Sequence, residues 1–316
     1  MLEELQYLAT VEHALSVEYL FAHYSLNAPM RLPGTGVSAR TRRIFAAANE
    51  VFSIAVDEMR HLRWVNEALN TLQVPSSVGR AERIGRQLDR PFALLPLTAE
   101  QLDWFIEVER PSQAVASGVD GMYVRLQATI DRRPDLFPER DRLVHLIKLI
   151  IDEGDDHFHR FEAVKEQLRG LTPAQYLRNL RADPPDQAAV GLLELSDRYY
   201  AALLFGLQAT FALADRAGGA LLEQARRMMD NFHEVNHVLA ARGVAPRFRL
   251  PAGFPAQPPT GAAGQALADD LADSLRAALD AVAATGASAG RALVTRQRPQ
   301  AEAFVAEYRD VVTALP

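Results

Sequence analysis

Residues 56–62 of the chain read VDEMRHL, and they place Glu58 and His61 three residues apart in a long stretch without proline or glycine. In an α-helix, residues three, four and seven apart share a face. The rest of the face that carries this pair is apolar: Ala47, Val51, Ile54, Val65, Ala68 and Leu72. A buried carboxylate is costly unless it is paired or binds a metal. The pair therefore indicates a buried polar site inside a helical protein.

Two other long stretches carry ionisable groups within an apolar helical stripe. Residues 2–26 place Glu12 in one stripe, and residues 138–169 place Glu153 and His157 in another. Glu12 alone has an ordinary explanation as a salt-bridge partner, and Glu153 with His157 alone has one as a surface pair on a helix. Ionisable residues that interrupt the apolar stripe of three different helices favour one shared explanation for all three. Helix bundles that bind two iron or manganese ions take a Glu from each of two helices and Glu-x-x-His from each of the other two. The chain carries much of that set.

The composition narrows the chemistry. The chain has 316 residues, a net charge of −6 and no cysteine, so thiolate zinc sites, iron–sulfur clusters and disulfides are excluded. No basic cluster predicts a nucleic acid or membrane partner. The most apolar run, from Tyr199, is shorter than a span of about 20 residues and contains Gln208, so we expect a buried core helix. Acidic residues near the start predict no export signal, and thus a cytoplasmic protein.

The helical segments and their breaks predict an all-α protein in two parts. Proline and glycine separate expected helices at about 2–26, 38–73, 98–108, 112–131 and 138–169. After the ADPPDQ break at Ala182 we expect helices near 188–215 and 218–242, a Pro/Gly-rich linker at 250–264, and two alanine-rich helices. We predict a metal-binding bundle over 1–181 and a helical region over 188–316. The alanine-rich helices are suited to the contacts of a homodimer.

Four motifs resemble a known family. They are VEHALSVEYLFAHYSL at 11–26, VDEMRHL at 56–62, FIEVERP at 105–111 and IIDEGDDHFHRF at 150–161. Together they resemble the ferritin-like proteins grouped with iminophenyl-pyruvate dimer synthase, over about residues 1–170 and more weakly beyond. The resemblance implies a ferritin-like four-helix bundle with additional C-terminal helices, a carboxylate-bridged metal site and an oxidative role in specialised metabolism.

The resemblance also implies a ligand set, which the sequence leaves open at two points. Carried over by position, the ligands are Glu12, Glu58, His61, Glu153 and His157. Because Glu153 and His157 are four apart rather than three, Asp156 is a substitute ligand. The helix expected at 112–131 contains no glutamate, and Met122 stands near the place of one. Glu109 is the nearest candidate, with Asp120 behind it; otherwise the site holds one metal, or two asymmetrically. Glu18 is a spare carboxylate.

The ligand types favour iron, with two ions expected and manganese as an alternative. We expect an O2-dependent oxidase or oxygenase that acts on a small organic molecule. Tyr19, in phase with Glu12, is either a nearby redox group or a packed aromatic. The long second half favours an enzyme. The lack of a glutamate in the helix expected at 112–131 favours the alternative, a non-catalytic metal-binding or scaffold protein.

A competing motif lies at residues 233–237. HEVNH matches the H-E-x-x-H pattern of zinc hydrolases, with His233, Glu234 and His237. Such a site needs a third protein ligand, and the next His, Asp or Glu after His237 is Asp269, beyond the linker. Coordination together with Glu194 and Asp197 is a further alternative.

Overall fold

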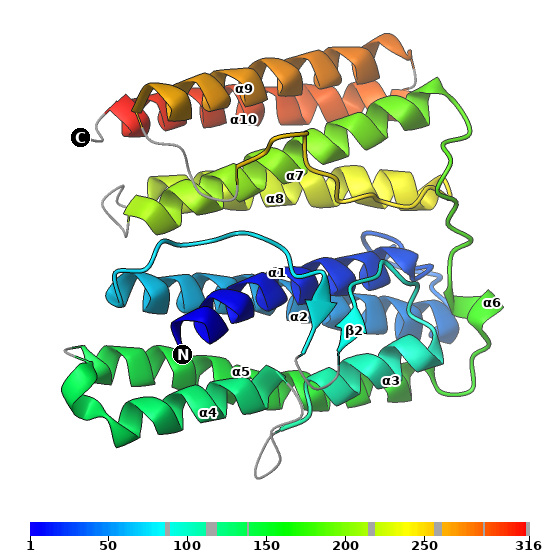
Figure 1. Ribbon diagram of the computed structural model, residues 1–316. Coiled ribbons are helices and arrows are strands. Elements are labelled where there is room, and N and C mark those ends of the chain that lie inside the picture. The colour runs from blue at the N-terminus through cyan, green and yellow to red at the C-terminus, as the bar shows by residue number, and fades with distance from the viewer. Residues whose placement is uncertain are drawn as a thin grey trace. The chain divides into compact units, whose positions relative to one another are not determined.

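The structure is a computed structural model that describes residues 1–85, 89–111, 119–137, 139–213, 219–255, 261–286 and 288–313. The chain folds as two compact units, Met1–Asn179 and Leu180–Pro316. Figure 1 shows that both are built from long helices, so the expected all-α fold is confirmed.

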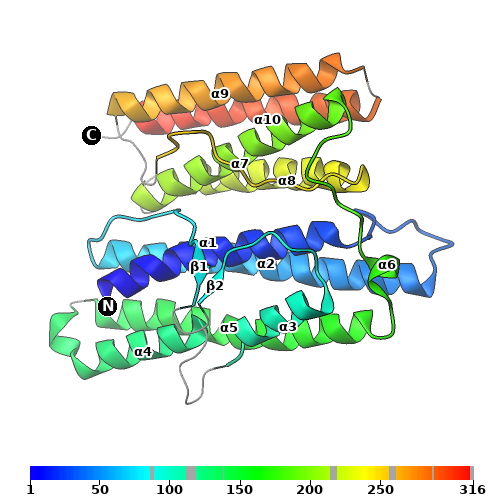
Figure 2. The same ribbon diagram turned by 45° about the vertical axis from the view of Figure 1, so that its right-hand side comes forward.

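The first unit is a four-helix bundle in which one position is shared by two helices. Its long helices are α1 (Leu2–Ser25), α2 (Ala39–Thr71) and α5 (Arg140–Leu168). Two shorter helices, α3 (Ala99–Val108) and α4 (Val119–Arg132), lie one after the other along α5 (Figures 1 and 2). The helix expected at 112–131 is thus seen as α4, and its expected first residues lie outside the described part of the chain.

Local signals set the helix boundaries. Ser38 caps α2, because its Oγ accepts a hydrogen bond from the Thr41 N–H at 3.0 Å. Thr98 caps α3 in the same way, with the Gln101 N–H at 3.2 Å. A 3₁₀ turn at Pro134–Leu136 joins α4 to α5, and the short α6 (Pro173–Tyr176) follows α5.

α1 is buried without interruption from Val11 to Ser25, so it has no solvent-facing side over this length.

One small element was not predicted. β1 (Arg83–Ile84) and β2 (Arg90–Pro91) pair antiparallel, with Arg83 opposite Pro91. This segment is fixed to α1, because the Tyr7 hydroxyl donates to the Arg83 carbonyl at 2.9 Å and the Ala81 N–H donates to the Thr10 carbonyl at 2.9 Å. The two-residue strands therefore depend on tertiary contacts, which a periodicity argument does not detect.

The second unit contains four long helices: α7 (Gln187–Leu213), α8 (Ala220–Ala241), α9 (Gly261–Ala284) and α10 (Ser288–Thr313). α7 packs against α8 and α9, and α10 packs against α8 and α9. α7 and α8 approach closely at Gly206, where an added Cβ would lie 3.2 Å from the Cβ of Ala225. No helix in the described part of the chain is long and apolar enough to cross a membrane.

Candidate metal centre

Glu58, His61 and His157 form the centre of a buried cluster in the first unit. Glu58 and His61 come from α2 and His157 from α5, and a ligand atom of each lies within 4.8 Å of the others. Glu58 Oε1 is 2.8 Å from His157 Nδ1 and 3.5 Å from His61 Nδ1. The two imidazole rings stack with centroids 5.1 Å apart. The E-x-x-H pair in VDEMRHL therefore points inward.

Three more carboxylates surround this centre. Glu12 of α1 and Glu153 of α5 flank His61: Glu12 Oε2 is 3.6 Å from Nδ1, and Glu153 Oε2 is 3.2 Å from Nε2. Glu109, the residue that ends α3, reaches His157, with Oε2 3.8 Å from Nδ1. The structure thus brings together all six residues that the sequence proposed as first-choice ligands.

Asp156, the substitute ligand, lies apart from this cluster. Its side chain is 64% exposed, and it is 3.4 Å from Arg160 on the outside of α5. Glu153 and His157 were expected on the same buried stripe. His157 is buried, whereas Glu153 stands at the edge of the site with its side chain 29% exposed.

Two buried tyrosines hold two of the carboxylates. The Tyr19 hydroxyl donates to Glu109, and the Tyr123 hydroxyl of α4 donates to Glu12. Tyr19 also packs edge-on against Phe105 and Phe161, so it is both a packed aromatic and a polar neighbour of the site. The sequence did not single out Tyr123. It directly follows Met122, where a glutamate was sought, and the shared bundle position brings both Glu109 and Tyr123 to the site.

A further layer supports the histidines. Asp57, which the sequence also did not single out, has Oδ2 3.6 Å from His157 Nε2 and 2.6 Å from Arg160 Nη1. A carboxylate behind a histidine fixes the orientation and tautomer of the ring. Trp64 stacks on the other histidine, with its ring centroid 5.8 Å from that of His61. The position of Asp57 immediately before Glu58 is the signal that could have found it.

Burial and close charges shift the acidities strongly. Burial, with the facing Glu58 carboxylate, raises the pKa of Glu12 to about 8. Burial opposes ionisation of Glu58 as well, but the facing imidazoles of His61 and His157 hold its pKa below the usual range. The pKa of His157 is raised to about 11, against burial, by Asp57, Glu109 and Glu58. These shifts favour an ionised Glu58 carboxylate between two protonated imidazoles, because the pKa of His61 is also raised by the facing carboxylates.

The cluster leaves an unusual number of buried polar atoms without an aligned hydrogen bond. They are both carboxylate oxygens of Glu58, both ring nitrogens of His157, His61 Nε2 and Glu153 Oε2. The 2.8 Å contact of Glu58 with His157 is short enough for a hydrogen bond but is not aligned as one. Buried polar atoms are rarely left unpaired without a reason such as a bound ion.

A small void lies beside Glu58 and His61. It measures about 20 Å³, and its walls include Glu12, Glu58, His61, Glu109 and Tyr123. A void of this size holds about one water-sized species. Glu58 and His61, which have atoms without an aligned hydrogen bond, line this void. Together with the neighbouring unpaired atoms of His157 and Glu153, they fit a metal ion held by carboxylate and imidazole.

The spare carboxylate Glu18 binds the backbone of another segment instead of the metal centre. It is buried, and its Oε1 accepts the Ala93 N–H at 2.9 Å. Burial raises its pKa to about 7, although the Ala93 N–H and the Arg90 guanidinium oppose the shift. Glu18 does not line the void of the metal centre.

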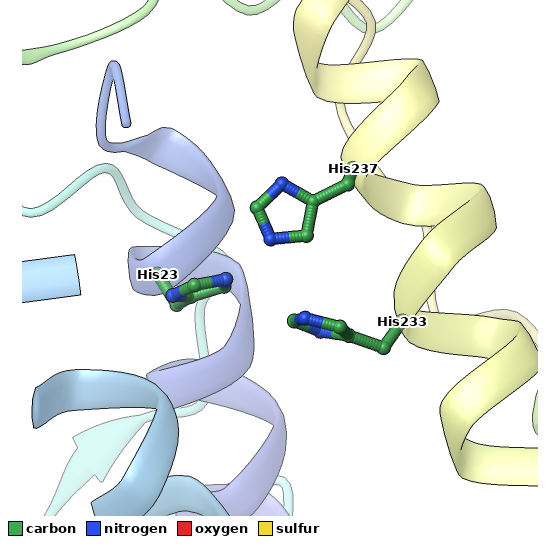
Figure 3. Close-up of side chains that lie close together, drawn as sticks. All are labelled: His23, His233 and His237. Atoms are coloured by element: carbon green, nitrogen blue, oxygen red, sulfur yellow. The ribbon is translucent and has the colours of Figure 1, made fainter. Parts of the chain in front are cut away.

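The HEVNH histidines lie on α8 in the second unit. Figure 3 shows His233 and His237 projecting from the same side of the helix, and their ring centroids are 4.6 Å apart. Glu234 accepts hydrogen bonds from Arg296 and, at 2.9 Å, from Gln297 of α10. Within the described residues of this unit, no third ligand-type side chain joins the two histidines within 4.8 Å. Within this unit the motif therefore supplies two of the three protein ligands that a zinc hydrolase needs.

The alternative partners Glu194 and Asp197 are engaged differently. Asp197 pairs with Arg247 at 2.6 Å. With Glu194 it lines a cavity of about 190 Å³ between α7 and residues 249–252, and His233 and His237 do not line that cavity.

Comparison with known proteins agrees with this fold. Residues 5–137 match the family model described as ferritin-like. A crystal structure of a ferritin-like protein from Caulobacter vibrioides is similar, with a TM-score of 0.54, 17% identity, and coverage of 78% of this chain and 96% of that chain. At this identity the likeness shows the fold alone. No curated protein matches the chain.

The matched family model over residues 5–137 and the similar crystal structure both indicate a ferritin-like fold. The coverage of 78% exceeds what the first unit alone contains, so the likeness extends into the second unit. The narrower grouping with iminophenyl-pyruvate dimer synthase stays a prediction.

Proposed function

We propose that this ferritin-like protein binds two metal ions, iron above manganese, and uses O2 to oxidise a small organic molecule. The observation that carries the proposal is the buried cluster of carboxylate and imidazole atoms without aligned hydrogen bonds in the first unit, beside a void that Glu58 and His61 line. Imidazole and carboxylate together suit iron and manganese. Without cysteine, the chain offers no thiolate that would favour zinc or an iron–sulfur cluster.

The distances suggest how the ligands divide. Glu12 and Glu153 lie against His61, and Glu109 lies against His157. Glu58 stands between the two histidines with both oxygens unpartnered. We assign one ion to the His61 side and one to the His157 side, with Glu58 shared.

The remaining residues hold and protect this set. Tyr19 and Tyr123 donate to Glu109 and Glu12 and so fix the direction of each carboxylate. Asp57 orients His157 from behind. Bound iron would supply the one-electron redox chemistry that O2 reduction requires. Burial of the Tyr19 hydroxyl, beside Glu109, raises its pKa well above the usual value, so it keeps its proton and remains a donor.

One observation favours metal binding without turnover as the second candidate. The void of about 20 Å³ has room for a water-sized species but not for an organic molecule beside the metal. An oxidase of this geometry needs its organic substrate to react from outside the void, or side chains at the site to move.

Metal content per chain, followed by O2 consumption, tests the proposal. We expect about two iron or manganese ions per chain of the wild type and their loss in Glu58→Ala. Glu67→Ala, on the same helix but paired with Arg63 at 2.9 Å, should keep them. One ion would leave a mononuclear site, and none after growth in supplemented medium would refute metal binding. If the reduced iron form consumes no O2 with metal firmly bound, the oxidase is refuted and the non-catalytic protein remains.

A further inference from the structure

Glu153 is the most solvent-accessible of the ligand-type residues in the metal centre. Its side chain is 29% exposed, against 1% for Glu58 and 3% for His61. One of its oxygens, Oε2, faces His61 Nε2 at 3.2 Å. Within the described residues, Glu153 therefore stands where the site comes nearest to solvent, between α2 and α5.

Arg60 holds Glu153 in this position from outside. Its guanidinium nitrogen Nη2 lies 3.2 Å from Glu153 Oε1, and the same nitrogen donates to Asp57. Asp57 is held on its other oxygen by Arg160 at 2.6 Å. Arg60 thus links the two carboxylates that border His61 and His157 on the solvent side.

The side chain of Arg60 is 53% exposed, whereas that of its partner Asp57 is 11% exposed. Exposed ion pairs contribute little stability and break readily. A guanidinium in this place repels an arriving dication, and it occupies a Glu153 oxygen that could otherwise capture the ion. Its release from Glu153 would remove both obstacles without unfolding either helix.

We propose that Arg60 is a latch on the access of metal ions to the centre. While it holds Glu153 Oε1, the site is closed on its solvent side; when the contact breaks, Glu153 turns outward, receives the ion and carries it to His61. Arg60 is a positioning residue and not a ligand. The inference rests on the proposed metal binding, and it concerns the rate of binding rather than the number of ions bound.

The test measures Co²⁺ uptake by the metal-free full-length protein, followed in a stopped-flow instrument by the absorbance of the bound ion. Chelator-driven release gives the reverse rate. Arg60→Gln removes the charge and the paired contacts, and Arg60→Lys keeps the charge but not the planar fork. Arg63→Gln is the matched control, because Arg63 lies one turn further along α2 and pairs with Glu67 at 2.9 Å.

We expect Arg60→Gln to bind and release Co²⁺ about tenfold faster at low salt, with unchanged stoichiometry. Removing one positive charge about 8 Å from the path of a dication accounts for about sixfold of the faster binding in a water-like dielectric. Salt near 1 M screens that part, so the remaining acceleration reports the latch. Arg60→Lys should be intermediate at high salt, and Arg63→Gln should match the wild type there.

Three results would overturn the latch. They are an acceleration in Arg60→Gln that vanishes at high salt, an equal acceleration in Arg63→Gln at high salt, or a lower Co²⁺ stoichiometry in Arg60→Gln. Failure of the wild type to bind Co²⁺, iron or manganese is a separate result, seen before any variant is made, and it would refute the proposed metal binding itself.

Discussion

Replacement of Glu58 by glutamine is the most direct perturbation of the metal centre. Glu58 is 1% exposed, and Oε1 lies 2.8 Å from His157 and 3.5 Å from His61. Glutamine keeps the shape of the side chain but removes the negative charge and one of the two potential ligand atoms. Glu58→Gln should therefore fold and bind metal poorly.

The size of the effect follows from the ligand count. Loss of a supporting residue of a metal ligand lowers affinity about 10- to 100-fold, so loss of the shared ligand itself should cost at least about 100-fold, or about 2.7 kcal/mol. A ligand that binds only the folded state stabilises it by mass action, so saturating metal should stabilise the variant by about 2.7 kcal/mol less. For a unit of 179 residues this corresponds to a Tm difference of about 5–11 °C.

Thermal unfolding with and without excess metal measures this quantity. Each variant is compared with its own metal-free form, so a change in intrinsic stability cancels. Glu67→Gln, a partly exposed position on the same helix, should show the full wild-type shift. A metal-induced shift in Glu58→Gln as large as in the wild type would refute the assignment of Glu58 as a ligand, and the cluster would then be a buried polar network.

Three further predictions concern neighbouring residues. Tyr123→Phe removes the hydroxyl that donates to Glu12, so metal affinity measured by calorimetry should fall about 10-fold. Glu153→Gln should lower the metal content, whereas Asp156→Asn, at a position 64% exposed, should not. Burial raises the pKa of Glu18 to about 7 from 4.5, so its contribution to stability is present below pH 4.5 and is lost as the pH rises through 7. Glu18→Gln should abolish this loss, about 3 kcal/mol, in denaturant unfolding between pH 4 and 8.

Control variants separate the expected changes in metal binding and stability from a general loss of folding. Tyr199→Phe in α7 removes a buried hydroxyl with no hydrogen-bond partner, so it should leave metal affinity unchanged. Equal affinity of Tyr123→Phe and the wild type would remove Tyr123 from the support of the centre. Metal loss in Asp156→Asn with retention in Glu153→Gln would reverse their roles. A stability profile of Glu18→Gln parallel to that of the wild type would show that Glu18 does not titrate on unfolding.

The long helices and the central ligand pair could be predicted from the sequence because their determinants are local. Proline, glycine and capping residues such as Ser38 and Thr98 set the helix ends. The interrupted apolar stripe placed Glu58 and His61 on an inward face, where they lie. For Glu153 the stripe was a poorer guide. It lies only about 40° from His157 around α5, but a helical stripe does not say which of its residues reaches the solvent edge of the bundle, where Glu153 lies.

The way in which the missing glutamate is replaced could not be derived from periodicity. Glu109 reaches the centre only because α3 ends beside His157 and the same bundle position resumes as α4. Tyr123 completes that wall with a hydroxyl instead of a carboxylate. These are consequences of chain path in three dimensions, and a helical stripe contains no information about where two successive helices meet a third.

Trp64 gives the centre an optical signal of its own. The chain contains two tryptophans; the Trp64 ring is stacked on His61, whereas the Trp104 ring packs under the guanidinium of Arg90 at 4.5 Å. A paramagnetic ion on His61 would quench the emission of Trp64 at this range. Intrinsic fluorescence can therefore report occupancy of the His61 side in real time without a label, and Trp64→Phe would leave only the emission of Trp104 as background.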